Sequence, residues 1–257
     1  MLRPVTILFA VVLLSISMTA CADVAESPQP ADSTLLFTLG DHEVTTANSI
    51  QWVGALDPTA SRRIADGLER DGVRYLIISS SVADNDTAFG LGNYFHSRQD
   101  VILVIDGQCI SGCFSVLAAA ASEVWVTDGS LYAYRGSPVF TTELMVRHGL
   151  QDHDRFLHVA ADGEVLRSLY HRLGLSPQIL VDAGEKLLPN GGYVENVGED
   201  SHFFYDRLFW VPSPEYLAQH SIDLQGDVIM DRGDAARRVS HHIPREMISS
   251  DSEWGFE

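Results

Sequence analysis

The chain has 257 residues, 46% of them hydrophobic, and a formal net charge of −18. This length and hydrophobic content suffice for one well-cored domain with a short tail. So acidic a surface repels the phosphates of nucleic acids and anionic membrane faces, which excludes nucleic-acid binding. It favours solubility, a salty environment or cationic partners.

The N-terminal residues predict export. Residues 1–20 begin with Met-Leu-Arg and continue as an apolar run too short to span a membrane, which is typical of a signal peptide. The residues Met18-Thr-Ala-Cys21 resemble a bacterial lipoprotein processing site, which would leave Cys21 lipidated at the mature N-terminus. The alternative is ordinary cleavage around Ala20-Cys-Ala22, which would release a soluble periplasmic protein. We favour the lipoprotein because Met18 is unusual for ordinary cleavage. We favour outer-membrane attachment because Ala22, directly after Cys21, is not the aspartate that resembles an inner-membrane retention signal.

The first elements are expected in the order tether, helix, helix, strand. Residues 21–33 are small, polar and proline-containing, as in a tether. A helix over 58–71 is predicted by an N-capping aspartate followed by proline at the first helical position. The helix expected over 84–98 is weaker because it contains two glycines. Residues 101–105 are consecutive and apolar, so they predict a buried strand.

The second half of the chain predicts further helices. Apolar residues recur at helical spacing over 153–173, and a second helix over 177–187 ends before a turn rich in proline and glycine. Trp125 and Phe140 are interpreted as core residues. Residues 34–230 are therefore expected to form a single α/β domain with parallel strands joined by helices, and residues 231–257 a C-terminal tail.

Ser111 is the main candidate for chemistry. It lies where the strand over 101–105, broken by Asp106-Gly107, gives way to a small-residue apolar run that predicts a buried helix. A hydroxyl at such a turn projects from the backbone, and the free N–H groups of the first helical turn can stabilise negative charge beside it. Many serine hydrolases place their nucleophile in this way. The alternative is a serine that only caps the helix.

The order of segments around Ser111 resembles a known superfamily. The segments that carry this resemblance are Ser49–Pro58, Val73–Ser81, Cys109–Cys113, Glu123–Thr127, Leu131–Tyr134 and Phe209–Ile222. They resemble the Clp-type serine protease and crotonase superfamily over residues 49–224, most closely its exported periplasmic members with a Cys-x-Ser-x-Cys segment. The resemblance implies a fold of repeated β-β-α units, Ser111 as nucleophile and the Gly112 N–H as oxyanion donor. Relatives assemble into rings or trimers, so a homo-oligomer is an expectation.

Two departures from the family pattern put catalysis in question. The family's Ser-x-Gly-Gly segment, whose glycines help to bind the oxyanion, reads Ser79-Ser-Ser81-Val82 here. A β-branched valine resists unusual backbone angles, so this loop is interpreted as a degenerate oxyanion loop. The family's catalytic histidine corresponds to Arg135, which is permanently protonated and cannot be a general base. The other candidate bases are His96, His148, His153, His158, His171 and Lys186.

The cysteines and histidines give little sign of a metal. With Cys21 lipidated, Cys109 and Cys113 remain as an even pair in an oxidising compartment. They predict either a disulfide that clamps the Ser111 turn or two buried free thiols. His148, His153 and His158 recur every five residues, a spacing that does not place them on one helical face. No metal and no cofactor are therefore expected.

Three functions follow from these residues. The first is an active serine hydrolase or peptidase with Ser111 as nucleophile and a non-standard general base. The second, which we favour, is a catalytically degenerate relative that binds a peptide or protein partner in the cell envelope. The third is an acyl-thioester binder of the crotonase type, which is the weakest because an exported protein would rarely meet coenzyme A.

Overall fold

The computed structural model describes residues 33–188, 193–197, 200–204, 207–243 and 254–256. The signal peptide predicted over 1–20, Cys21 and all but the last residue of the predicted tether lie outside them. Residues from Ser33 onward cluster as one compact unit. Within the described residues, no helix is both long and apolar enough to cross a bilayer.

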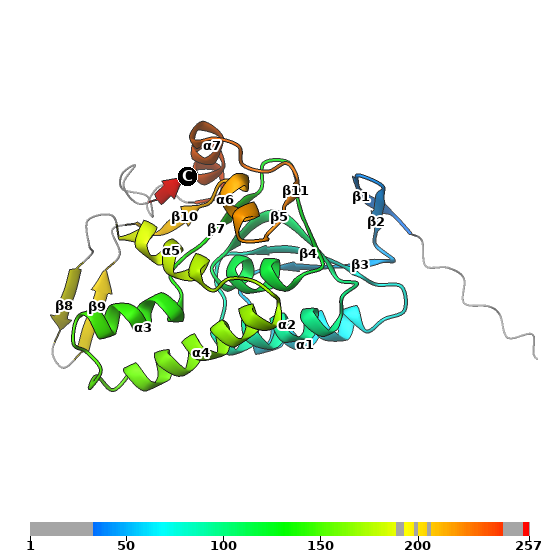
Figure 1. Ribbon diagram of the computed structural model, residues 1–257. Helices are drawn as coiled ribbons and strands as arrows, with labels where there is room; N and C mark the ends of the chain where they lie inside the picture. Colours follow the sequence, from blue (N-terminus) through cyan, green and yellow to red (C-terminus); the bar gives the residue numbers. More distant parts are fainter. Residues whose placement is uncertain (1–32, 189–192, 198–199, 205–206, 244–253, 257) are drawn as a thin grey trace, which may run out of the picture. The chain divides into compact units, whose positions relative to one another are not determined.

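A parallel sheet forms the centre of the domain (Figure 1). Its strand order is β11-β6-β5-β4-β3, and every neighbouring pair runs parallel. The strands are β3 (Ser49–Val53), β4 (Tyr75–Ser80), β5 (Ile102–Ile110), β6 (Glu123–Val126) and β11 (Gln225–Gly226). The α/β fold with parallel strands expected from the sequence is therefore confirmed.

Strand β5 bends, so that on one side its two halves pair with different strands, β6 and then β7 (Leu131–Ala133), while β4 pairs with both halves across a register shift. Its first half, over 102–105, pairs with β4 and β6. Its last residues, over 108–110, pair with β7. The bend falls at Gly107, whose φ is +114°, and a Cβ there would lie 2.6 Å from the Ser79 hydroxyl oxygen. Only glycine suits both the backbone angle and the close approach, and the bend carries the end of β5 towards Ser111.

Seven α-helices pack around the sheet in the described residues. They are α1 (Pro58–Leu68), α2 (Asn85–Ser97), α3 (Pro138–Arg147), α4 (Phe156–Arg172), α5 (Gln178–Leu187), α6 (Pro214–Gln219) and α7 (Arg232–His242). The helices predicted over 58–71, 84–98, 153–173 and 177–187 appear as α1, α2, α4 and α5. Figure 1 shows α1, α2 and α4 on the same side of the sheet.

The sheet buries both of its faces. On one face, Leu76, Leu103 and Ile105 belong to the large core shared with the helices. On the other face, alternate residues such as Ile77 and Val104 pack with the hairpin of β1 (Leu35–Leu39) and β2 (His42–Thr45). Burial on both faces explains why these strands read as continuous apolar runs. Phe140 is 1% exposed, as expected of a core residue, and Trp125 packs beneath the hairpin.

The region beyond residue 231 corrects the prediction of a tail. Residues 232–242 form α7, and its Arg238 is only 5% exposed. The Arg238 guanidinium donates to the Asp234 carboxylate, one turn earlier, and to the carbonyls of Ser130 and Asp227. The helix was not predicted because most of its residues are polar, and the sequence does not show that Arg238 is buried and fully paired. The domain therefore extends beyond 230.

Four further strands complete the description. Strand β10 (Phe209–Val211) pairs in parallel with β12 (Trp254–Phe256). Strands β8 (Tyr193–Val197) and β9 (Asp200–Phe204) form an antiparallel hairpin. Strand β12 is a second element in the stretch that the sequence had assigned to a tail.

Candidate active site

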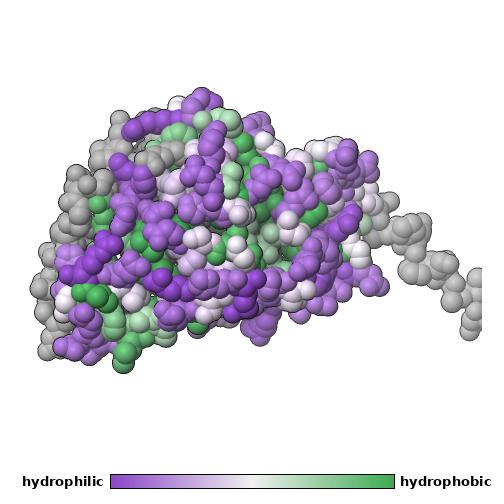
Figure 2. All heavy atoms as spheres, in the orientation of Figure 1, coloured by the Kyte–Doolittle hydropathy of each residue, from purple (hydrophilic) through white to green (hydrophobic). Residues whose placement is uncertain are grey.

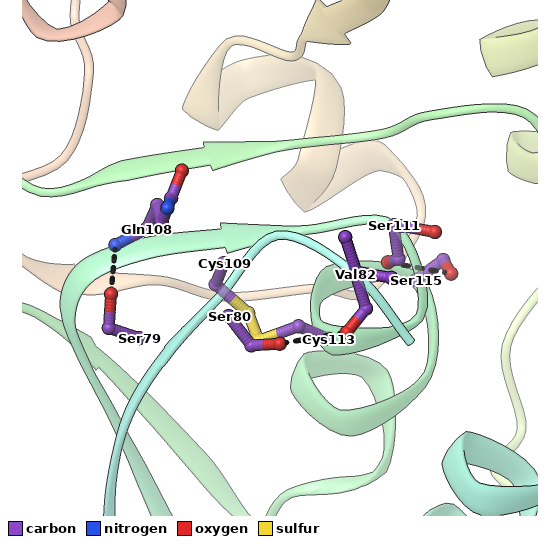
Figure 3. Close-up of a disulfide and its surroundings, with 8 residues drawn as sticks. All are labelled: Ser79, Ser80, Val82, Gln108, Cys109, Ser111, Cys113 and Ser115. Atoms are coloured by element: carbon purple, nitrogen blue, oxygen red, sulfur yellow. Dashed lines mark hydrogen bonds between the residues drawn. A yellow bond between two sulfur atoms is a disulfide. The ribbon is translucent and has the colours of Figure 1, made fainter. Parts of the chain in front are cut away.

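Ser111 lies in a tight turn between β5 and a buried π-helix over Cys113–Ala118 (Figure 3). Its φ is +61°, a left-handed conformation that a residue with a side chain adopts only under strain. The Ser111 carbonyl accepts bonds from the N–H groups of Phe114 and Ser115, at 2.9 and 2.8 Å, and from the Ser115 hydroxyl at 3.0 Å. These bonds hold the turn in its strained shape.

The Ser111 hydroxyl is not used in capping. The π-helix has Gly112 at its N-terminal boundary and no side-chain capping bond. Strain at a strand-to-helix turn is typical of a nucleophile elbow, in which the hydroxyl is held out for chemistry. Among the two interpretations made from the sequence, the geometry favours the projecting hydroxyl over the cap.

A disulfide brackets the turn. Cys109 and Cys113 are bonded to each other, with their Cα atoms 5.2 Å apart, and both are fully buried. The bond ties the end of β5 to the first turn of the π-helix, with Ser111 between the two cysteines (Figure 3). Of the two alternatives left open by the sequence, a clamp and a pair of free thiols, the structure has the clamp.

Gly112 brings the Ser111 turn close to the start of α2. A Cβ at Gly112 would lie 2.7 Å from Ala83 Cβ and 3.0 Å from Ala88 Cβ. Both distances are too short for a larger residue to fit without movement of the backbone. The Gly112 N–H also lies in the first helical turn, where N–H groups lack intrahelical partners and can face an anion.

The loop after β4 forms the opposite wall. Its Val82 carbonyl accepts bonds from the Leu56 N–H at 2.9 Å and from the Ser80 hydroxyl at 3.0 Å. The only non-glycine residues with positive φ in the described part of the chain are Ser111 and Ser221. Val82 therefore has an ordinary backbone conformation, and its side chain is 55% exposed. The loop is built without the freedom that the family's two glycines would give.

These walls enclose a cavity of about 690 Å³. Ser81, Val82, Ser111 and Arg135 all line it. The structure thus brings together the four lining residues that the sequence had singled out, with Gly112 packed beside them. Helix α3 begins at the same cavity, where Ser137 caps it by accepting a bond from the Phe140 N–H.

The described lining of this cavity contains no histidine and no lysine. His153 and His158 line a neighbouring cavity of about 310 Å³, which shares Asn85 and Asp162 with the first. The remaining candidate bases, His96, His148, His171 and Lys186, line neither cavity. Within the described residues, no cluster of three or more metal-ligating side chains occurs.

Two lining residues were missed by sequence reasoning. Asp162 on α4 is the one carboxylate of the described lining; it accepts a bond from the Asn85 amide at 2.8 Å and lies 4.0 Å from the His158 ring. Arg207 lies just before β10, and its guanidinium donates to the Lys186 carbonyl at 3.1 Å. Neither has a local sequence signal, because each reaches the cavity from an element far from Ser111 in the chain.

A third cavity, of about 320 Å³, opens from the same wall. It shares Ser81, Val82 and Arg135 with the Ser111 cavity and is otherwise largely apolar. Its polar groups include Gln108, whose side-chain oxygen is buried without a hydrogen-bond partner among the described residues. They also include His242, whose Nε2 lies 2.9 Å from the Gly129 carbonyl oxygen. Burial lowers the pKa of His242, which favours the neutral ring.

Comparisons with known proteins complete the description of the site. No protein-family model and no curated protein matches the chain. One similar solved structure is a mutant of the 1510-N membrane-bound stomatin-specific protease, at 12% identity and a TM-score of 0.39, covering 81% of this chain and 95% of that one. Another is a ClpP1 mutant from Listeria monocytogenes, at 12% identity and a TM-score of 0.38, covering 73% of this chain and 94% of that one. Roles for individual residues therefore come from this chain alone.

Proposed function

We propose that this chain is a catalytically degenerate relative of the Clp-type serine proteases, whose Ser111 cleft binds a peptide or protein partner without cleaving it. It acts in the bacterial cell envelope, facing the periplasm and tethered by lipid on Cys21. The observation that carries the proposal is the make-up of the cavity wall. A strained serine faces a cavity whose described lining offers arginines where a general base is needed.

The chemical reason is that serine is a weak nucleophile at its own pKa. A neighbouring base must take its proton, within about 2.6–3.2 Å of the hydroxyl oxygen. The hydroxyl of Ser111 forms no hydrogen bond to any described side chain, and Arg135 remains protonated at every physiological pH. The site offers the Gly112 N–H to a carbonyl group, but its described lining has no histidine or lysine to take the proton that starts the reaction.

An active hydrolase is the second candidate, and the strain at Ser111 favours it. A positive φ at a serine costs of order 1–3 kcal/mol, and such strain concentrates at functional turns. Asp162 would then be the first residue to consider as base, since it is the one carboxylate of the described lining. Its bond to Asn85 weakens this role, because a carboxylate that already accepts a bond is a poorer proton acceptor.

The two candidates are separated by covalent labelling. We expect the purified domain, from residue 33 onward, to be left unlabelled by a fluorophosphonate probe while it retains peptides from a peptide library. The matched control is Ser111→Ala, which should bind the same peptides with unchanged affinity. Labelling of the wild type that disappears in Ser111→Ala would overturn the proposal in favour of the hydrolase.

A further inference from the structure

The cleft carries the opposite charge to the molecule around it. The whole chain has 35 acidic residues against 17 lysines and arginines, and hydrophilic side chains cover most of the face drawn in Figure 2. Together, the described linings of the three joined cavities contain three arginines, Arg135, Arg155 and Arg207. Against these they contain one carboxylate, Asp162. A cavity lined by one sign of charge concentrates ligands of the other sign.

Arg135 is the most available of these cations. It lines both the Ser111 cavity and the apolar side cavity, and its side chain is exposed. It takes part in no hydrogen bond or ion pair with any described residue. A guanidinium presents a planar fork of donors that matches a carboxylate in two parallel bonds. Its place at the junction of the two cavities lets it meet a ligand that enters either of them.

Arg207 adds a second cation on the same wall. Its one described side-chain bond goes to the Lys186 carbonyl, and no described carboxylate pairs with its charge. The single lining carboxylate does not neutralise either arginine, because Asp162 is bonded to Asn85. The nearby Asp84 is occupied too, since its carboxylate caps α2 through the Thr87 N–H. Both of these carboxylates are thus engaged locally, while the two guanidiniums line the cavity.

We propose that the Ser111 cleft recognises acidic peptides, with Arg135 and Arg207 binding carboxylates of the ligand. The proposal rests on the proposed peptide-binding function and names the class of peptide. It reverses the expectation from the overall charge, which favours cationic partners. Within an acidic molecule, the cleft offers an anionic chain three lining arginines against one lining carboxylate.

The test compares two peptides of equal length by fluorescence anisotropy. One carries glutamates and a free C-terminal carboxylate; the other carries glutamines and a C-terminal amide. We expect the acidic peptide to bind at least tenfold more tightly at low salt, and the difference to shrink as salt is raised. Arg135→Gln should weaken acidic-peptide binding about tenfold, and Arg135→Gln with Arg207→Gln about a hundredfold, with the glutamine peptide unaffected.

Arg63→Gln is the matched control, because Arg63 is exposed on α1 and does not line the cleft. It removes the same charge and should leave both affinities unchanged. Equal affinities for the two peptides, or equal effects of Arg63→Gln and Arg135→Gln, would overturn the acidic specificity while leaving peptide binding intact. If neither peptide bound and the protein took up the fluorophosphonate probe, the proposed peptide-binding function itself would be overturned.

Discussion

Arg238 and Arg135 place the same side chain in two regions with opposite surroundings. Arg238 on α7 is 5% exposed and is bound by two carboxylates, Asp227 at 2.9 Å and Asp234 at 2.8 Å, and by two carbonyls. Arg135 on the cleft wall is exposed and bonds to no described residue. A buried charge must be fully paired for the fold to tolerate it. A charge left unpaired at a cavity contributes nothing to the stability of the fold. The contrast separates an anchoring arginine from a ligand-binding one.

The largest effect is expected where the anchoring arginine is removed. Arg238→Met should lower the free energy of unfolding by about 3 kcal/mol, because it strands the Asp234 carboxylate in a partly buried site without its cation. Urea denaturation measures this loss. Arg237→Met is the control, since Arg237 is 76% exposed with one ion pair to the same aspartate, and it should cost under about 0.5 kcal/mol. Equal losses in the two variants would mean that Arg238 does not anchor α7.

The same contrast shows what could be predicted from the sequence. Three kinds of local signal mark the strand before Ser111 and the helices α1, α4 and α5. They are a continuous apolar run, a capping aspartate and helical periodicity, and they made the positions of these elements predictable. Helix α7 also begins with a capping aspartate, Asp231, but it buries only two apolar residues, Ala235 and Val239, so its helical periodicity is weak. Its stability comes from Arg238 bonds to Asp227 and Ser130, whose distance along the chain hides them from any local pattern.

The site was predictable to a similar degree. Ser111, Gly112, Arg135 and the Ser81-Val82 loop could be named because each lies within a short motif. Asp162 and Arg207 could not, because α4 and the segment before β10 bring them to the cavity only in the folded chain. A cluster built from five separate segments leaves no spacing for sequence reasoning to detect.

An intermediate effect is expected from the disulfide, which lies on either side of the Ser111 turn and so belongs to the cleft region. Replacing both Cys109 and Cys113 by alanine should lower the free energy of unfolding by about 2 kcal/mol, the chain-entropy value for so short a loop. Urea denaturation measures it, and the wild type with reductant should behave like the variant. If the double variant were as stable as the oxidised wild type, the strained Ser111 turn would be held by its carbonyl bonds alone.

The smallest effect concerns His242, which belongs to both regions because it lies on α7 and lines the side cavity. Burial first, and then the nearby positive charges of His241 and Arg238, lower the pKa of His242 below its usual value of about 6.5, against the opposing bond to the Gly129 carbonyl. The unfolded chain therefore takes up a proton at this position before the folded chain does. Stability from this group is complete above about pH 6.5 and is lost as the pH falls through the lower, folded pKa.

Thermal melts at pH 7.5 and 5.5 test this. We expect the melting temperature of the wild type to fall between the two, and His242→Gln to show a smaller fall because glutamine does not titrate. His171→Gln is the matched control: His171 is exposed on α4 and is not among the groups that shift the pKa of His242, so the fall in this variant should equal that of the wild type. A full-sized fall in His242→Gln would place the pH sensitivity elsewhere. A reduced fall would show that the region anchored by Arg238 responds to pH while the cleft arginines, permanently charged, keep their attraction for acidic ligands.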